Sequence, residues 1–298
     1  METQSINKTA NASLVGIGWM IFYSALISGM HVSIRYVADS GLHPFEIAFF
    51  RNLFALIAVV PWFIKYGLTP LKTKKLGWLV TRGAVNTLCM LSFFMAISII
   101  PLAEVTALSF TAPIFATMLA IPIFGEKVGI RRWGAILLGL GGVMIILRPG
   151  FQVVGYGQWL VLFSAVGWAV CLIIIKNLGK TESAVTITTY MSLVMAPLTL
   201  IPALFYWQWP TWEQLAVLAG LGILGGCGQM AMAQSLRLAD THVVTPFDYT
   251  RLIFVSILGY LLFEQIPDRY VWIGGTLIFI SVAFIAYREQ IKRSAQTT

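Results

Sequence analysis

The residues best suited to chemistry lie in one apolar segment near the end of the chain. Asp248 and Arg251 are three positions apart, so a helix would present both on one face. They could neutralise each other as a structural ion pair, or they could offer opposite charges to a zwitterionic ligand. Because an ionisable side chain inside a bilayer costs at least about 2.5 kcal/mol, we favour ligand binding. Tyr249 lies between them, and Pro246 is expected to interrupt the helix because it lacks a backbone donor.

Other polar or aromatic residues within apolar segments are further candidates for solute binding. Arg82 and Asn86 share a helix face, where the guanidinium could hold a carboxylate or phosphate, or could instead extend to lipid headgroups. His31 can titrate near neutral pH, but a hydrogen-bonded interior histidine is the more common case. Gln229 could face a cavity or join helices. Trp168 would suit a flat or cationic solute, although most such rings only pack.

Four residues are candidates for gating or structural roles. Arg51 is followed by Asn52 in an apolar segment, and we favour a structural or gating role for it. Glu104 could be a gate or a proton-linked group, but we favour a simple anion at a helix N-terminus. Pro113, together with nearby small polar residues, is expected to loosen its helix, as Pro246 does in the second half.

The composition requires that lipid solvate part of the chain. Of 298 residues, 58% are hydrophobic and only 11% are charged, against about 25% charged in soluble proteins. The net charge of +8 would suggest nucleic acid in a soluble protein, but here the basic residues lie between apolar segments, so we expect no nucleic-acid partner. The three cysteines lack metal-ligand spacing and are expected to be small buried hydrophobes, so no metal or cofactor is expected.

Ten apolar segments are long enough to cross a bilayer about 30 Å thick. They are separated by short connections with turn residues or charges. The predicted segments cover residues 14–37, 44–64, 77–99, 103–123, 131–148, 157–176, 184–205, 213–236, 243–263 and 269–288.

The distribution of Lys and Arg predicts the orientation of these segments. Fourteen lie in one set of alternate connections, which includes both termini, and three lie in the other set, namely Arg35, Arg148 and Arg269. Since Lys and Arg remain in the cytoplasm, both termini are expected there, in a multi-pass protein of the inner (plasma) membrane.

An internal repeat divides the segments into two sets of five. Leu102-Ala103-Glu104 recurs as Leu238-Ala239-Asp240, and an apolar run follows each copy. We therefore predict one repeat over 14–148 and a second over 157–288. Five is odd, so the two repeats would be inverted across the membrane. The predicted fold class is an all-α polytopic membrane protein of ten transmembrane helices in two inverted five-helix repeats.

Several motifs resemble those of the drug/metabolite transporter superfamily, in its ten-helix branch with two EamA-type repeats. They are Phe49-Phe50-Arg51-Asn52, the run from Ala96 to Glu104, Ala112-Pro113-Ile114-Phe115, Gly125-Glu126-Lys127, Trp133-Gly134 and the glycines of 139–142. The resemblance covers essentially the whole chain. It implies a ten-helix inverted-repeat permease for small organic solutes, which include amino acids, vitamins and nucleoside derivatives.

We therefore expect a secondary transporter, and not an enzyme, that moves a small zwitterionic or anionic metabolite by alternating access. The alternatives are a multidrug or toxic-cation exporter and a non-transporting membrane scaffold. The expected partners are the solute and the lipid bilayer, with a homodimer as one candidate assembly. Substrate identity, direction and ion coupling are left open.

Overall fold

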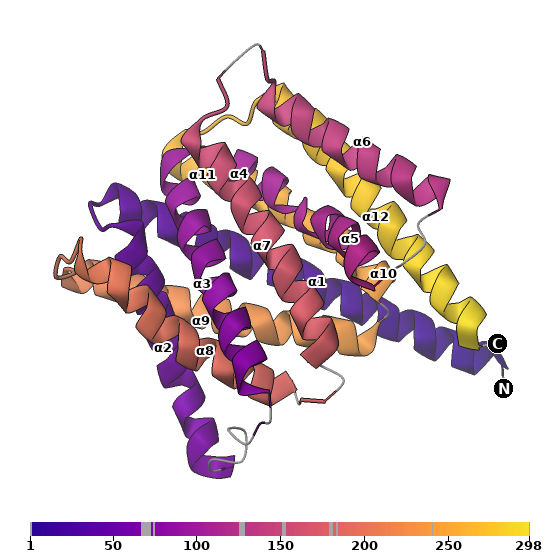
Figure 1. The fold of residues 1–298 in the computed structure, drawn as a ribbon, viewed down its shortest axis with the longest axis horizontal. Helices are drawn as coiled ribbons and strands as arrows, with labels where there is room; N and C mark the ends of the chain where they lie inside the picture. The colour runs from indigo at the N-terminus through magenta and orange to yellow at the C-terminus, as the bar shows by residue number, and fades with distance from the viewer. Residues whose placement is uncertain are drawn as a thin grey trace.

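A computed structural model describes residues 2–66, 73, 75–124, 129–150, 153–178, 181, 182, 184–239 and 241–297. Over these residues the protein is built of helices joined by short connections, and no β-strand is present among them (Figure 1). The helices are α1 (Glu2–Asp39), α2 (Pro44–Tyr66), α3 (Leu76–Ile99), α4 (Leu102–Ser109), α5 (Ala112–Phe124), α6 (Ile130–Leu147), α7 (Tyr156–Leu178), α8 (Ala184–Leu204), α9 (Trp212–Leu238), α10 (Thr241–Val244), the 3₁₀ helix η2 (Thr245–Tyr249), α11 (Thr250–Phe263) and α12 (Arg269–Thr297).

These helices make ten traversals, because α4 with α5, and α10 with η2 and α11, each form one interrupted traversal. Within the described part of the chain, seven helical segments are long and apolar enough to cross a membrane. Shorter apolar stretches lie in α6 and α8. Many large apolar side chains point outward, such as Leu137, Phe163 and Ile223. In water this would be unfavourable, so these surfaces are suited to contact with lipid.

The main helix contacts keep the same pattern when the two halves are exchanged. The first traversal packs on the eighth (α1 on α9), and the sixth packs on the third (α7 on α3). The second pairs with the seventh (α2 with α8), the fifth with the tenth (α6 with α12), and α4 of the fourth with α11 of the ninth. Each half has five traversals, so the second half starts from the opposite end. The predicted fold class, two inverted five-helix repeats, is therefore confirmed.

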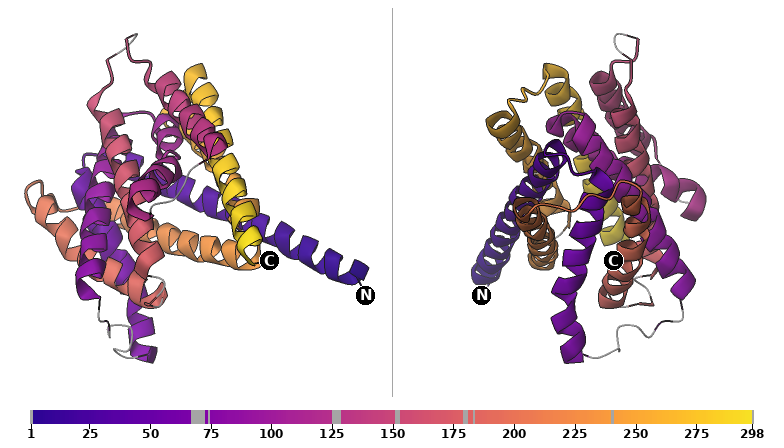
Figure 2. Two further views of the ribbon diagram at one scale, coloured as in Figure 1. Left: turned by 45° about the vertical axis from the view of Figure 1, so that its right-hand side comes forward. Right: turned by 90° about the vertical axis from the view of Figure 1, so that its left-hand side faces the viewer.

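Close approach of α6 and α12 depends on two glycines. A Cβ atom added at Gly142 would lie 2.5 Å from the carbonyl oxygen of Gly274, which is too close for any side chain. The two helices lie side by side in all views (Figures 1 and 2). Backbone contact of this kind is common between helices in membranes, where van der Waals packing replaces the hydrophobic effect as the cause of association.

The start of α1 and the end of α12 lie at one end of the molecule, as an even number of traversals requires (Figure 2). At the other end, α1 turns into α2 through Gly41, whose φ of 101° favours glycine. Asp240 and residues 125–128, which belong to the predicted motifs, lie outside the described residues. Among the cysteines, Cys227 is exposed on α9 and not buried as predicted, because it faces away from the bundle.

Candidate solute site

Two interrupted helices meet near the middle of their traversals. The fourth traversal is interrupted between Ser109 of α4 and Ala112 of α5. The ninth is interrupted at the 3₁₀ helix η2, residues 245–249. The rings of Phe110 and Tyr249, one from each interruption, have centroids 5.1 Å apart. In membrane proteins, irregular backbone is tolerated only where it is buried in protein or lines a cavity. Crossed interruptions from two inverted repeats are typical of transporter binding sites.

Local sequence accounts for both interruptions. Before α5, the hydroxyl of Thr111 donates to the carbonyl of Leu108 at 2.7 Å, and Pro113 supplies no amide hydrogen. Such side-chain bonds compete with the regular helical pattern. In η2, Pro246 removes another donor, and the Thr250 hydroxyl donates to the carbonyl of Phe247 at 2.7 Å. Both interruptions therefore lie beside the prolines at which the sequence predicted a loosened helix.

Asp248 and Arg251 form an ion pair at the second interruption. Their Oδ2 and Nη2 atoms are 3.2 Å apart, and their side chains are only 23% and 14% exposed. Two serines of α1 hold this segment in place. Ser24 donates to the carboxylate of Asp248 at 3.2 Å, and Ser28 donates to the carbonyl of Arg251 at 3.2 Å. The pair is thus anchored between the first and ninth traversals, with its charges largely shielded from solvent.

Aromatic rings surround the ion pair. The guanidinium carbon of Arg251 lies 4.7 Å from the centroid of Phe110, close enough for a cation–π interaction. The ring of Phe279 in α12 lies 4.6 Å from that of Tyr249. These rings and Asp248 line a cavity of about 80 Å³. Small-molecule sites usually measure about 300–1,000 Å³, so a solute of nucleoside size could enter only if the helices moved apart.

His31 and Trp168 are connected to each other through a third ring. His31 is on the same face of α1 as Ser24 and Ser28, is 3% exposed, and has no hydrogen-bond partner for its Nδ1 atom. Its ring contacts Phe93 at 5.2 Å, and Phe93 contacts Trp168 at 4.9 Å. The structure therefore joins His31 of α1 to Trp168 of α7 through Phe93 of α3.

Three predicted residues lie elsewhere. Arg82 donates to the carbonyl of Ile187 at 3.2 Å, and the amide of Asn86 contacts the sulfur of Met195 at 3.1 Å. Both contacts join α3 to α8 and do not involve the interrupted helices. Gln229 is exposed on α9. The structure therefore does not bring these side chains together with Asp248 and Arg251.

The predicted gating residues occupy two other positions. Arg51 donates to the side-chain oxygen of Asn52 at 3.1 Å and contacts the sulfur of Met90, and no acidic side chain among the described residues pairs with it. Glu104, in the first turn of α4, accepts a hydrogen bond from Gln158 of α7 at 2.9 Å. Glu104 thus joins two helices in addition to lying at a helix N-terminus.

The family model of the EamA-like transporter family matches this chain twice, over residues 14–148 and 155–287. The chain belongs to the EamA-like transporter family. It is a small-metabolite permease with several membrane-spanning helices, and it is not an enzyme.

Similar proteins within the EamA family have named solutes. The chain is 29% identical over 285 residues to an S-adenosylmethionine uptake transporter of Rickettsia bellii, covering 96% of this chain and 98% of that protein. It is 30% identical over 283 residues to a riboflavin transporter of Vibrio cholerae, covering 94% and 95%. A solved crystal structure with 16% sequence identity aligns with a TM-score of 0.62 over 94% of this chain and 98% of that one, which shows the shared fold.

Sequence reasoning did not identify four residues of this EamA site. Ser24, Ser28 and His31 follow one another at one-turn spacing and so form a polar stripe along an apolar helix. That stripe is a sequence signal from which the two serines could have been predicted. Phe110 and Phe279 carry no such signal, because aromatic residues are frequent throughout the chain. Only the fold shows that they contact Arg251 and Tyr249.

Proposed function

We propose that this permease carries a zwitterionic metabolite with a planar ring, of the nucleoside-derivative class, by alternating access across the inner (plasma) membrane. The observation that supports it best is the shielded Asp248–Arg251 ion pair, bordered by Phe110 and Tyr249 at the crossing of two interrupted helices. The proposed orientation, with both termini in the cytoplasm, rests on the distribution of Lys and Arg.

The ion pair suits a solute that carries both charges. An α-amino-acid group has an ammonium for Asp248 and a carboxylate for Arg251, whose planar guanidinium can hold a carboxylate with two hydrogen bonds. When such an amino-acid group binds, one buried pair is replaced by two, so neither Asp248 nor Arg251 is left unpaired. A solute with a single charge would leave one partner unsatisfied.

The surrounding rings suit the remainder of such a solute. Tyr249 and Phe279 could stack on a planar base, and Phe110 could contact a cationic centre. S-adenosylmethionine combines an amino-acid group, a sulfonium and a purine, whereas riboflavin is planar but uncharged. The similarity to the S-adenosylmethionine transporters therefore agrees better with this site than the similarity to the riboflavin transporters.

Other residues have proposed roles in the movement. Pro113 and Pro246 would allow the interrupted helices to bend, and Arg51 and Glu104 would help to open or close the path, as gating or structural groups. His31 and Trp168 would border the solute on the side of α1 and α7. Arg82, Asn86 and Gln229 are not assigned to the site, because their contacts lie elsewhere.

The test is uptake into liposomes that contain the purified protein. We expect saturable uptake of labelled S-adenosylmethionine and its near loss in Asp248→Asn. The matched control is Asp39→Asn, since Asp39 also pairs with an arginine of its own helix, Arg35, but is 45% exposed. Uptake of riboflavin alone would favour an uncharged planar solute, and uptake of only a lipophilic cation such as tetraphenylphosphonium would favour a drug exporter. Either result would contradict the proposal.

A further inference from the structure

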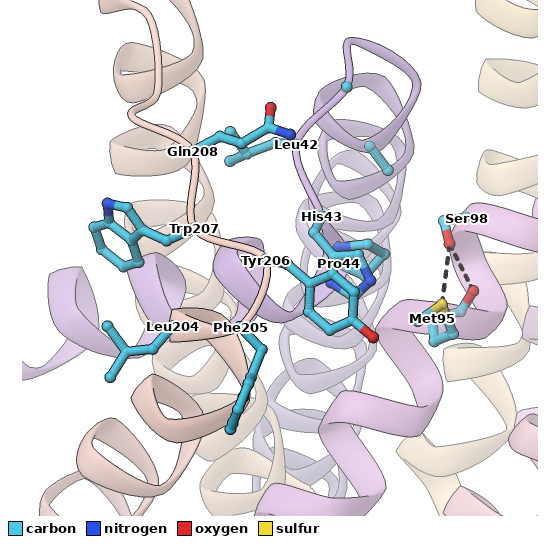
Figure 3. Close-up of a pocket in the computed structure, with 12 residues that line it drawn as sticks. Leu42, His43, Pro44, Met95, Ser98, Leu204, Phe205, Tyr206, Trp207 and Gln208 are labelled. Carbon is cyan, nitrogen blue, oxygen red and sulfur yellow. Dashed lines mark hydrogen bonds between the residues drawn. The ribbon is translucent and has the colours of Figure 1, made fainter.

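A second, larger cavity lies at the end of the bundle that the distribution of Lys and Arg assigns to the outside. It measures about 730 Å³, which is within the usual range for a small-molecule site. It lies between the turn that joins α1 to α2, the end of α3, and the segment that follows α8 (Figure 3). Both repeats therefore contribute to its walls, and it is separate from the cavity at Asp248.

Hydrogen bonds between the two repeats fix the positions of these walls. Glu46 is fully buried and accepts from the backbone amides of Gln208 at 2.6 Å and His43 at 3.2 Å. Nearby, Tyr36 donates to Glu213 at 2.9 Å. A buried carboxylate with two backbone donors fixes the relative position of the α1–α2 turn and the segment after α8. The cavity is therefore part of the folded structure and does not depend on the position of one surface side chain.

The wall chemistry favours a flat, uncharged group. His43 and Tyr206 are stacked, with ring centroids 3.8 Å apart and planes only 5° from parallel. Figure 3 shows these two rings in the middle of the lining residues, with Ser98 of α3 to their right and Gln208 above them to the left. None of the residues that line the cavity is Asp, Glu, Lys or Arg. Partial burial lowers the pKa of His43 from its usual 6.5, so its ring is neutral at neutral pH.

We propose that this cavity is a loading site, in which the planar ring of the solute stacks on Tyr206 and hydrogen-bonds to Ser98 and Gln208 before the solute reaches the ion pair. Tyr206 is 51% exposed, so part of its ring is open to such a partner. Uncharged rings bind at the outer cavity, and charges bind at Asp248 and Arg251. This inference rests on the proposed function for the identity of the solute, but not for the existence of the cavity.

The experiment measures how far a bound planar compound protects a cysteine in the cavity wall from labelling by a maleimide. Ala38→Cys, at a small lining residue that has no assigned contact with the solute, is introduced with Cys227→Ser, because Cys227 is the exposed native thiol among the described residues. Intact cells are treated with a membrane-impermeant maleimide, with and without riboflavin or adenosine as planar probes. We expect either probe to slow the labelling several-fold. The control is Val153→Cys, 93% exposed in a connection on the same side of the membrane, which no probe should protect.

Two further variants identify the cause of protection. In Tyr206→Ala we expect protection of Ala38→Cys to weaken about tenfold, the size expected for loss of one aromatic stack, whereas Tyr206→Phe should retain it. In Asp248→Asn protection should persist, because the loading site does not use that carboxylate. If uptake fails but protection persists, the proposed function is wrong and the loading site stands. Absence of protection, its loss in Asp248→Asn, or labelling only after the cells are permeabilised would overturn the loading site.

Discussion

The ion pair between Asp248 and Arg251 can be tested by removing its charges one at a time and then together. Asp248→Asn keeps the shape of the side chain and an oxygen for the hydrogen bond from Ser24, but it removes the negative charge. Arg251 is then left as an unpaired cation within the bundle. The double variant Asp248→Asn with Arg251→Gln removes both charges and leaves none unpaired. Comparison of the two variants separates a structural role from solute binding.

The expected size of the effect follows from the burial of the pair. Loss of one partner costs about 3–5 kcal/mol in a fully buried pair and about 0–1 kcal/mol in an exposed one. The side chains of Arg251 and Asp248 are 14% and 23% exposed, nearer to the buried case. We expect about 3 kcal/mol of lost interaction in Asp248→Asn, and the same loss between Asp248 and the solute ammonium corresponds to a KM about 150-fold higher.

The assay combines transport with stability. Initial rates of S-adenosylmethionine uptake are measured in liposomes over a range of concentrations, and thermal unfolding is measured in detergent. We expect the unfolding temperature to fall in Asp248→Asn and to recover in the double variant, because a neutral pair has no unpaired charge. Transport should not recover, since neither charge is present to bind the zwitterion.

One result would refute this reasoning. If the double variant transports S-adenosylmethionine with the KM of the natural sequence, the pair only holds η2 and α11 in place, and the solute binds elsewhere. The structural interpretation would then be correct. Equal transport by Asp248→Asn and the natural sequence would lead to the same conclusion.

Four other substitutions, one of them a control, test the packing and the cavity wall. Gly275→Ala would place a Cβ atom 2.6 Å from the hydroxyl of Tyr249, so we expect a higher KM from displacement of that ring, measured by uptake. In Gly142→Ala the added Cβ atom would meet the backbone of α12, so the free energy of unfolding should fall by about 1–3 kcal/mol. The control is the neighbouring Gly141→Ala, whose Cβ atom would have nothing within 4 Å, so the free energy of unfolding should change by less than about 0.5 kcal/mol. Both are measured by thermal unfolding. Burial lowers the pKa of His43, so its neutral form is favoured in the folded state, and the unfolding temperature should fall as the pH drops below about 6.5, more steeply than in His43→Gln.

Each of these expectations has a contrary outcome. Gly275→Ala with unchanged uptake would show that the position of Tyr249 does not matter for the solute. Equal unfolding temperatures for Gly142→Ala and Gly141→Ala would show that α6 and α12 are not in backbone contact. Parallel pH profiles for the natural sequence and His43→Gln would exclude His43 as the titrating group.

The sequence by itself determined the architecture of this protein and the place of its charge pair. Twenty-residue apolar segments have few stable forms in a bilayer, because their backbone groups must bond within the segment, so ten helices and their order could be predicted. The three-residue spacing of Asp248 and Arg251 is local, and a helix turns it into a pair without help from the rest of the fold. The interruption at Pro246 follows from the missing backbone donor in the same way.

Only the tertiary structure decided which partners complete the site. Ser24 and Asp248 are 224 positions apart, and their contact depends on how α1 packs against the ninth traversal. Arg82 had a sequence signal as good as that of Arg251, yet its bonds lie between α3 and α8. Phe110 had no signal and lies against the guanidinium of Arg251. A side chain's type and spacing define what it can bind, but long-range helix packing determines what it meets.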